Sequence, residues 1–183
     1  VEILKDKEGL NYGPKKITIS TAGIANKIPE AANEIGTYLA LSLHAPTDDI
    51  REMIMPINKK FKIKDLIEQC KYYSSIVKEK ITLEYVMLRD INDSIRCAKQ
   101  LIKLMAQFPC KVNLIEFNPW PGVQYLPTKR NKMEEFGKII QEAGYIATIR
   151  RSRGQDILGA CGQLRTESQK IKQPQKEKII SFF

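Results

Sequence analysis

The sequence predicts an α/β fold built on a mainly parallel sheet. Short apolar runs alternate with longer segments of helical spacing, and this strand–helix order repeats along the chain. The run 38–43 is apolar at nearly every position, which is typical of a strand buried on both faces of a parallel sheet. Five such strands are too few to close an eight-stranded barrel, so an open arc of a barrel and a doubly wound sheet are the two alternatives.

The strands are predicted from short runs rich in β-branched and other apolar residues. The first run, ITIST, stops at Gly23, and the last run, before Arg150, is the least regular. The five predicted strands span 17–21, 38–43, 81–88, 112–117 and 145–149. Residues 1–16 are polar and predict a loop or the remnant of an element that begins upstream.

Helical periodicity and capping residues predict the segments between the strands. Residues 63–77 carry one apolar stripe at spacings of three and four, which is the pattern of an amphipathic helix. The first predicted helix contains Pro29, which we expect to interrupt it. The predicted helices lie within 24–36, from the capping Thr47 to Pro56, over 63–77, from 92–94 onward, and from a capping Thr128 to Ala143.

Composition limits the class of protein. The chain has 183 residues, about one domain, and a net charge of +9, which favours a polyanionic partner such as RNA or DNA over a membrane. A lysine-rich proteome is the alternative source of that charge. Four cysteines without a C-x-x-C pair do not have the spacing of zinc or iron–sulfur ligands and fit a reducing cytoplasm. No apolar run is long enough to span a bilayer, and the first residue is Val1, so we expect a fragment.

Polar residues follow the predicted strands where a parallel α/β fold binds its ligands. Ser20 and Thr21 end the first strand, Ser42 and His44 follow the second, and Asn118 follows the fourth. Hydroxyl, imidazole and amide groups at one edge suit a small molecule with ribose and carboxylate groups, or a sugar phosphate. Each residue also has a purely structural alternative, because serine, threonine and asparagine often bond to nearby backbone.

The segment RRSRGQDILGACGQ, residues 150–163, contains the most reactive candidate. Cys161 lies between Ala160 and Gly162, and the arginines before it favour the thiolate form. This combination predicts sulfur chemistry on an anionic partner. A small buried cysteine that follows a basic loop is the alternative.

Three further features have two interpretations each. Glu84, within a predicted strand, points either to a barrel interior or to an exposed edge. Trp120, between two prolines, stacks on a base or fills a loop. The lysines of 59–64 contact phosphate or form a solvated face.

Five strings in order resemble the RlmN/Cfr family of radical-SAM RNA methyltransferases, with a closer likeness to RlmN than to Cfr. They are ITISTAGI, LALSLHAPTDDIREMIMPINKKF, ITLEYVMLRDINDS, PCKVNLIEFNPWPG and RRSRGQDILGACGQL, and they extend from about residue 17 to 164. The resemblance implies the C-terminal part of a partial (β/α)6 TIM-like barrel. It divides the chain into a remnant or loop over 1–16, a truncated barrel domain over 17–164 and a basic, flexible tail over 165–183.

The resemblance also implies the chemistry, which is methylation at C2 of an adenosine in large-subunit (23S) ribosomal RNA and in tRNA. Cys161 matches the cysteine that first receives a methyl group from S-adenosylmethionine. A second S-adenosylmethionine is cleaved at a [4Fe-4S] cluster, and the radical that results activates the methyl group on sulfur. The residues that match the family's contacts to S-adenosylmethionine are Ser20, Ser42, Leu43, His44 and Asn118.

The sequence departs from the family in lacking the C-x-x-x-C-x-x-C motif that holds the cluster and the Gly-Glu-Pro segment after it. We therefore expect no metal ligands in this chain, weak or no binding of S-adenosylmethionine by the chain alone, and no activity without a missing N-terminal half. The alternatives are a non-catalytic, basic RNA-binding remnant and a Cfr-type enzyme that methylates C8. An aldolase-like barrel is a poorer match, because the strand ends lack a clear lysine or carboxylate pair.

Overall fold

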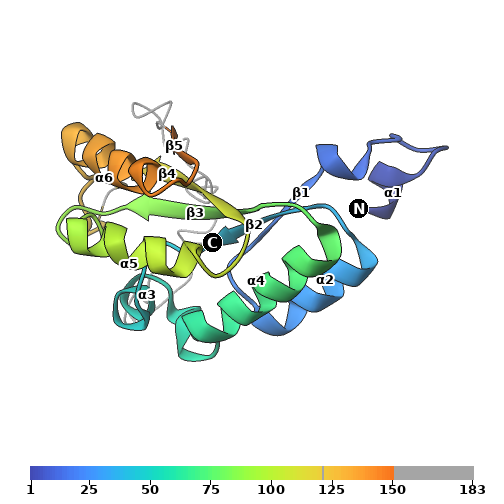
Figure 1. Ribbon diagram of the computed structural model, residues 1–183, viewed down its shortest axis with the longest axis horizontal. Coiled ribbons are helices and arrows are strands. Elements are labelled where there is room, and N and C mark those ends of the chain that lie inside the picture. The colour runs from blue at the N-terminus through green and yellow to red at the C-terminus, as the bar shows by residue number, and fades with distance from the viewer. Residues whose placement is uncertain (121, 151–183) are drawn as a thin grey trace, which may run out of the picture.

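The computed structural model describes residues 1–120 and 122–150. These residues form a five-stranded sheet in which every neighbouring pair is parallel and the strand order is β1-β2-β3-β4-β5 (Figure 1). The strands are β1 Thr18–Thr21, β2 Tyr38–Ser42, β3 Ile81–Met87, β4 Cys110–Glu116 and β5 Ala147–Arg150. A doubly wound sheet reverses its strand order, so the strictly sequential order selects the open arc of a barrel.

The helices are α1 Glu2–Lys5, α2 Ile28–Glu34, α3 Asp48–Ile54, α4 Ile63–Val77, α5 Ile95–Met105 and α6 Arg130–Glu142. Sequential parallel strands joined by right-handed crossovers place their connecting helices on one face of the sheet. The apolar stripes of α2, α4, α5 and α6 accordingly share one core with the strands. Along the described residues, no helix combines the length and the apolar character needed to cross a membrane.

Burial alternates along β3 in the way that a half-covered sheet requires. Ile81, Leu83, Tyr85 and Met87 are buried on the helix side, and the residues between them are partly exposed. Burying a large apolar side chain contributes roughly 1.5–3 kcal/mol, so this one strand anchors much of the core. The neighbouring β2 is buried from Leu39 to Ser42, as its continuous apolar run predicts.

The opposite face of the sheet carries a polar row. The register pairs Ser42 with Glu84, Glu84 with Asn113, and Asn113 with Thr148, so four neighbouring strands contribute one residue each. The Thr148 hydroxyl is hydrogen-bonded to the side-chain oxygen of Asn113. Glu84 lies on the central strand, on the face away from the helices, which selects the barrel interior over the exposed edge for this carboxylate.

Two predictions about helix ends were wrong. Pro29 does not interrupt a helix: it occupies the first turn of α2, where its missing N–H is not needed by the helix. Thr128 does not cap α6, whose N-cap is Lys129; its hydroxyl instead donates to Oδ2 of Asp93 at 3.0 Å. The polar segment 1–16 contains the short α1 and a 3-10 turn over Pro14–Lys16.

Helix α4 is tied to the turn before β2 by one buried hydroxyl. Tyr73 is 1% exposed, and its hydroxyl donates to the backbone carbonyl of Thr37 at 2.7 Å. The adjacent Tyr72 is 40% exposed and donates to Oδ1 of Asn33 at the surface, at 3.2 Å. The two tyrosines therefore form a matched pair of a buried and an exposed hydrogen bond.

Tyr73→Phe is expected to lower the free energy of unfolding by about 1–3 kcal/mol, because it leaves the buried Thr37 carbonyl without its donor. Tyr72→Phe is the control and is expected to change it by less than about 0.5 kcal/mol. Chemical denaturation of both variants measures the difference. Equal effects of the two substitutions would contradict the role of the buried hydroxyl.

Candidate functional site

The carboxyl ends of the parallel strands gather the predicted polar residues at one edge of the sheet. Ser20 is exposed near the end of β1, and Ser42 and His44 are buried at and beyond the end of β2. Asn118 is buried two residues after the end of β4. Because the strands are parallel neighbours, these residues share one edge, as the sequence predicts.

Leu43 differs from the other predicted residues. Its side chain is fully buried in the core on the helix side. Its backbone N–H donates to the Glu84 carbonyl at 3.1 Å, and its carbonyl accepts from Nε of Arg51 at 3.1 Å. A ligand at this edge can therefore meet only the backbone of Leu43, at the second lone pair of the carbonyl.

His44 is held in an unusual backbone conformation by bonds on every side. Its φ of 58° lies in the left-handed region, which costs a non-glycine residue about 1–2 kcal/mol. Its N–H donates to the Glu84 carbonyl at 3.1 Å, and its carbonyl accepts from Nδ2 of Asn92 at 2.8 Å. The N–H of Val86 donates to Nδ1 of the imidazole ring at 3.2 Å. The ring and its backbone are thus both fixed by β3 and the loop after it.

These contacts define the chemical state of His44. Nδ1 accepts a hydrogen bond and carries no proton, so the neutral ring holds its proton on Nε2. Burial and, to a smaller extent, the nearby Arg51 guanidinium lower the pKa of His44, the Glu84 backbone carbonyl opposes the shift in part, and the net pKa is about 4. At neutral pH the side chain is therefore an uncharged donor through Nε2–H, suited to an oxygen or nitrogen acceptor on a ligand.

Two residues outside the predicted set hold this edge together. Arg51 is fully buried and donates to backbone carbonyls at the ends of β1 and β2. Burial lowers its pKa to about 10, so the side chain is still charged at pH 7. Asn92 is also fully buried, and its Oδ1 accepts from Leu88 N–H at 2.7 Å. The sequence carries one signal for Arg51: it shares a helix face with the buried Ile54 at a spacing of three.

Trp120 lies in the loop after β4 and packs with aromatic neighbours. The Trp120 ring meets Phe117 edge-on with centroids 5.5 Å apart, and Tyr125 lies 6.5 Å from the same phenyl ring. These rings belong to a second, smaller apolar cluster with Met55 and Leu88. The packing supports the loop-filling interpretation of Trp120, although the indole remains partly exposed.

The described cysteines do not fit a [4Fe-4S] cluster, which needs several converging thiolates. Cys70, Cys97 and Cys110 are buried, and all three belong to the core on the helix side. Burial raises the pKa of Cys70 and of Cys110 to about 12, so both stay protonated. Within 1–120 and 122–150, no group of three or more His, Cys, Asp or Glu side chains is placed to hold a metal ion.

Cys161, the predicted methyl carrier, lies outside the described residues, together with Arg151 and Arg153. Arg150 is the last described residue and ends β5, paired in register with Ile115. The chain therefore leaves the described region at the same edge as Ser42 and His44. The position of Cys161 relative to that edge stays a prediction.

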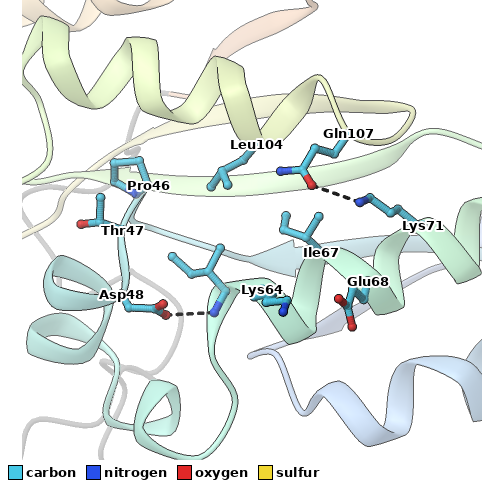
Figure 2. Close-up of a pocket in the computed structure, with 10 residues that line it drawn as sticks. Pro46, Thr47, Asp48, Lys64, Ile67, Glu68, Lys71, Leu104 and Gln107 are labelled. Carbon is cyan, nitrogen blue, oxygen red and sulfur yellow. Dashed lines mark hydrogen bonds between the residues drawn. The ribbon is translucent and has the colours of Figure 1, made fainter.

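A separate hollow is lined by residues of α4, by Leu104 of α5 and Gln107 after it, and by the segment 46–48 (Figure 2). Nζ of Lys71 donates to Oε1 of Gln107 at 3.0 Å within its lining, which also includes the apolar Ile67 and Leu104. None of the predicted ligand-contacting residues lines it. The two regions are therefore distinct candidates for binding.

The sequence is similar to those of curated RNA methyltransferases. The chain is 48% identical over 171 residues to the dual-specificity RNA methyltransferase RlmN of Rhizobium meliloti (strain 1021), which covers 93% of this chain and 42% of that protein. It is 46% identical over 175 residues to RlmN of Agrobacterium fabrum, covering 95% of this chain and 43% of that protein. No protein-family profile matches the chain.

A solved structure of a radical SAM methyltransferase from Sphaerobacter thermophilus superposes with a TM-score of 0.84 at 40% identity, over 89% of this chain and 48% of that one. The fold and this likeness define the class to which the chain is related: over the part that it spans, the chain is homologous to a radical SAM methyltransferase and shares its fold. Within that class the chain is homologous to the RlmN RNA methyltransferases. It spans about two fifths of the length of the curated relatives that it matches.

The neutral state of His44 makes stability depend on pH in a defined window. The folded protein keeps the ring unprotonated down to a pKa of about 4, whereas the unfolded chain takes up a proton near 6.5. The unfolded state thus binds more protons between these values, so stability falls as pH drops from about 6.5 to about 4, by about 3 kcal/mol. Urea denaturation across this range measures the loss.

His44→Asn is the control, because asparagine tolerates the left-handed backbone and keeps an acceptor but does not titrate. Since His44 is the sole histidine of the sequence, this variant is expected to lose most of the pH dependence above pH 5. An unchanged pH profile in His44→Asn would show that the ring is not the group responsible.

Proposed function

We propose that this chain is the C-terminal part of an RNA methyltransferase that methylates C2 of an adenosine in 23S ribosomal RNA and in tRNA, in the cytoplasm. The observation that carries the proposal is the edge formed by Ser42, His44 and Asn118 in a chain homologous to proteins named dual-specificity RNA methyltransferase RlmN. The net charge of +9 suits an RNA partner.

The residues at the carboxyl edge fit an adenosyl ligand by their chemistry. The hydroxyls of Ser20 and Ser42 both donate and accept hydrogen bonds, as ribose hydroxyls require. His44 offers an uncharged donor through Nε2, and Asn118 offers both an amide donor and a carbonyl acceptor. We assign these residues the binding and orientation of S-adenosylmethionine, which when bound supplies the methyl group.

Cys161 is assigned the acceptor role. Its thiolate, which the arginines at 150, 151 and 153 favour, would form a bond to the methyl carbon of S-adenosylmethionine while the methyl–sulfonium bond breaks, so that S-adenosylhomocysteine leaves. The radical chemistry of the class needs a cluster that the described cysteines do not fit, so we assign no step of it to them. We propose that the N-terminal half found in the relatives supplies the remainder of the reaction centre.

Cys161→Ala is expected to abolish methyl transfer to RNA when the N-terminal half of a relative is supplied, because no sulfur remains to carry the methyl group. Mass spectrometry of nucleosides from the treated RNA measures the product and separates 2-methyladenosine from the 8-methyladenosine of a Cfr-type enzyme. The matched control is Cys97→Ala, which removes a sulfur on the helix side and should retain transfer.

The rival function is a non-catalytic RNA-binding module, which the positive net charge favours. In that case both cysteine variants and the unaltered chain yield no methylated nucleoside, while RNA is bound with a steep dependence on salt. Methyl transfer that survives Cys161→Ala would exclude the proposed carrier.

The chain alone is expected to bind S-adenosylmethionine weakly, because it spans only about two fifths of the length of its relatives. Isothermal titration calorimetry should give no saturable heat at micromolar ligand, and binding should appear once the N-terminal half is added. Tight binding by the chain alone would contradict the need for that half.

A further inference from the structure

We propose that Arg51 is a positioning residue whose buried guanidinium holds the ends of β1 and β2 in the one geometry that presents His44 to a nucleoside. The nucleoside part of this inference rests on the proposed function. The positioning part concerns this chain's own geometry and can be tested without any ligand.

The contacts of Arg51 converge on two strand ends. Nη2 donates to the Ala22 carbonyl at 2.8 Å and to the Ser42 carbonyl at 3.1 Å. Nε donates to the Leu43 carbonyl at 3.1 Å. Ala22 directly follows β1, and Ser42 and Leu43 are the last residue of β2 and the one after it. A single planar group therefore links the end of β1 to the end of β2.

The guanidinium is itself fixed from behind. Its Nη1 donates to Oδ1 of the buried Asn58 at 3.0 Å. Nδ2 of Asn58 donates in turn to the backbone carbonyl and to Oδ1 of Asp48, at 3.2 and 2.9 Å. The first residue of α3, the 3-10 turn after it and the side chain of Arg51 thus form one connected network, which limits the freedom of the fork.

The backbone after β1 is shaped around the same group. Gly23 has a φ of 97°, and a Cβ placed on it would lie 2.8 Å from Nη2 of Arg51. Only glycine combines this left-handed conformation with so close an approach. The β1 end is therefore packed directly against the donor that also holds the β2 end.

The arrangement costs stability, which argues for a geometric role. Arg51 is fully buried, and the ion pairs found among the described residues do not include it. Three backbone carbonyls, the Asn58 side chain and, without a direct ion pair, the Asp48 carboxylate stabilise its charge. Even buried ion pairs can often be replaced by apolar side chains of similar volume without loss of stability. The charged guanidinium of Arg51 is therefore explained by the backbone carbonyls that it fixes, which are those of Ser42 and Leu43, immediately before His44.

The conformation of His44 depends on these contacts. Arg51 holds the backbone on the near side of the left-handed turn, and Asn92 holds the His44 carbonyl on the far side. Without the hydrogen bonds from Arg51, the backbone at His44 can relax toward a less strained conformation. Nδ1 of His44 then loses its hydrogen bond from the Val86 N–H. The ring would exchange between its two tautomers and would no longer present a fixed Nε2–H.

The sole histidine of the chain allows a direct test on the protein as it exists. Nitrogen-15 NMR of the imidazole is expected to show one neutral tautomer, with the proton on Nε2, in the unaltered chain. Arg51→Met, which keeps the volume and removes the fork, is expected to give a mixture of tautomers. Lys62→Met is the matched control, since it removes a cation that pairs with Glu52 at the surface and should leave the signal unchanged.

If Arg51→Met does not fold, as judged by circular dichroism, Arg51→Lys gives the same readout, because lysine keeps the charge but lacks the fixed fork. A folded Arg51 variant of either kind that keeps the single Nε2–H tautomer overturns the proposal. So does an Nδ1–H tautomer in the unaltered chain.

A second readout separates this proposal from the proposed function. With the N-terminal half supplied, the Arg51 variants are expected to raise the KM for S-adenosylmethionine about tenfold or more, with a smaller change in kcat. If the unaltered protein shows no binding or activity in that assay, the proposed function fails while the tautomer result stands. A tautomer shift with no change in KM overturns the link between His44 geometry and the nucleoside.

Discussion

Parallel pairing of the five described strands in chain order is the constraint on which the rest of this structure depends. It places α2, α4, α5 and α6 on one face, where their apolar side chains share a core with β2, β3 and β4. It also brings every strand carboxyl end to one edge. The alternation of side chains then leaves Ser42, Glu84, Asn113 and Thr148 in a row on the opposite face.

Hydrogen bonds from side chains to backbone carbonyls fix the residues that follow the ends of β1 and β2. Beyond the last ladder pair, the Glu84 carbonyl of β3 still accepts from the N–H groups of Leu43 and His44, and the side chains of Arg51 and Asn92 hold the carbonyls of Ala22, Leu43 and His44. The strained backbone of His44 persists because these contacts over-determine it. The same contacts make the imidazole neutral, so the edge is rigid and carries a donor without a charge.

Much of this was predictable from sequence, because local patterns determine it. The stripe of α4 gave its limits at residues 63 and 77, and the five apolar runs gave the five strands to within a few residues. The polar strand ends follow from the rule that parallel strands share a carboxyl edge. Glu84 was ambiguous, since only the strand order places β3 in the centre of the sheet.

The remaining features depend on contacts between distant residues, which no local pattern encodes. Thr128 has the sequence position of a helix cap, but its hydroxyl donates a hydrogen bond to Asp93, 35 residues earlier. Arg51 looks like a surface residue of a short helix, yet its partner Ala22 lies 29 residues away. The burial of Arg51 and Asn92 and the tautomer of His44 therefore emerge only from the folded chain.

We propose that a nucleoside binds at the carboxyl edge of the sheet, and the most direct test is photolabelling with an adenosyl analogue that carries an azide on the base, in the presence of the N-terminal half. Proteolysis and mass spectrometry are expected to place the label on peptides containing Ser42 to His44 and Asn118, and excess S-adenosylmethionine is expected to prevent the labelling. A label confined to the separate hollow, on Lys71 or Gln107, would contradict the proposal.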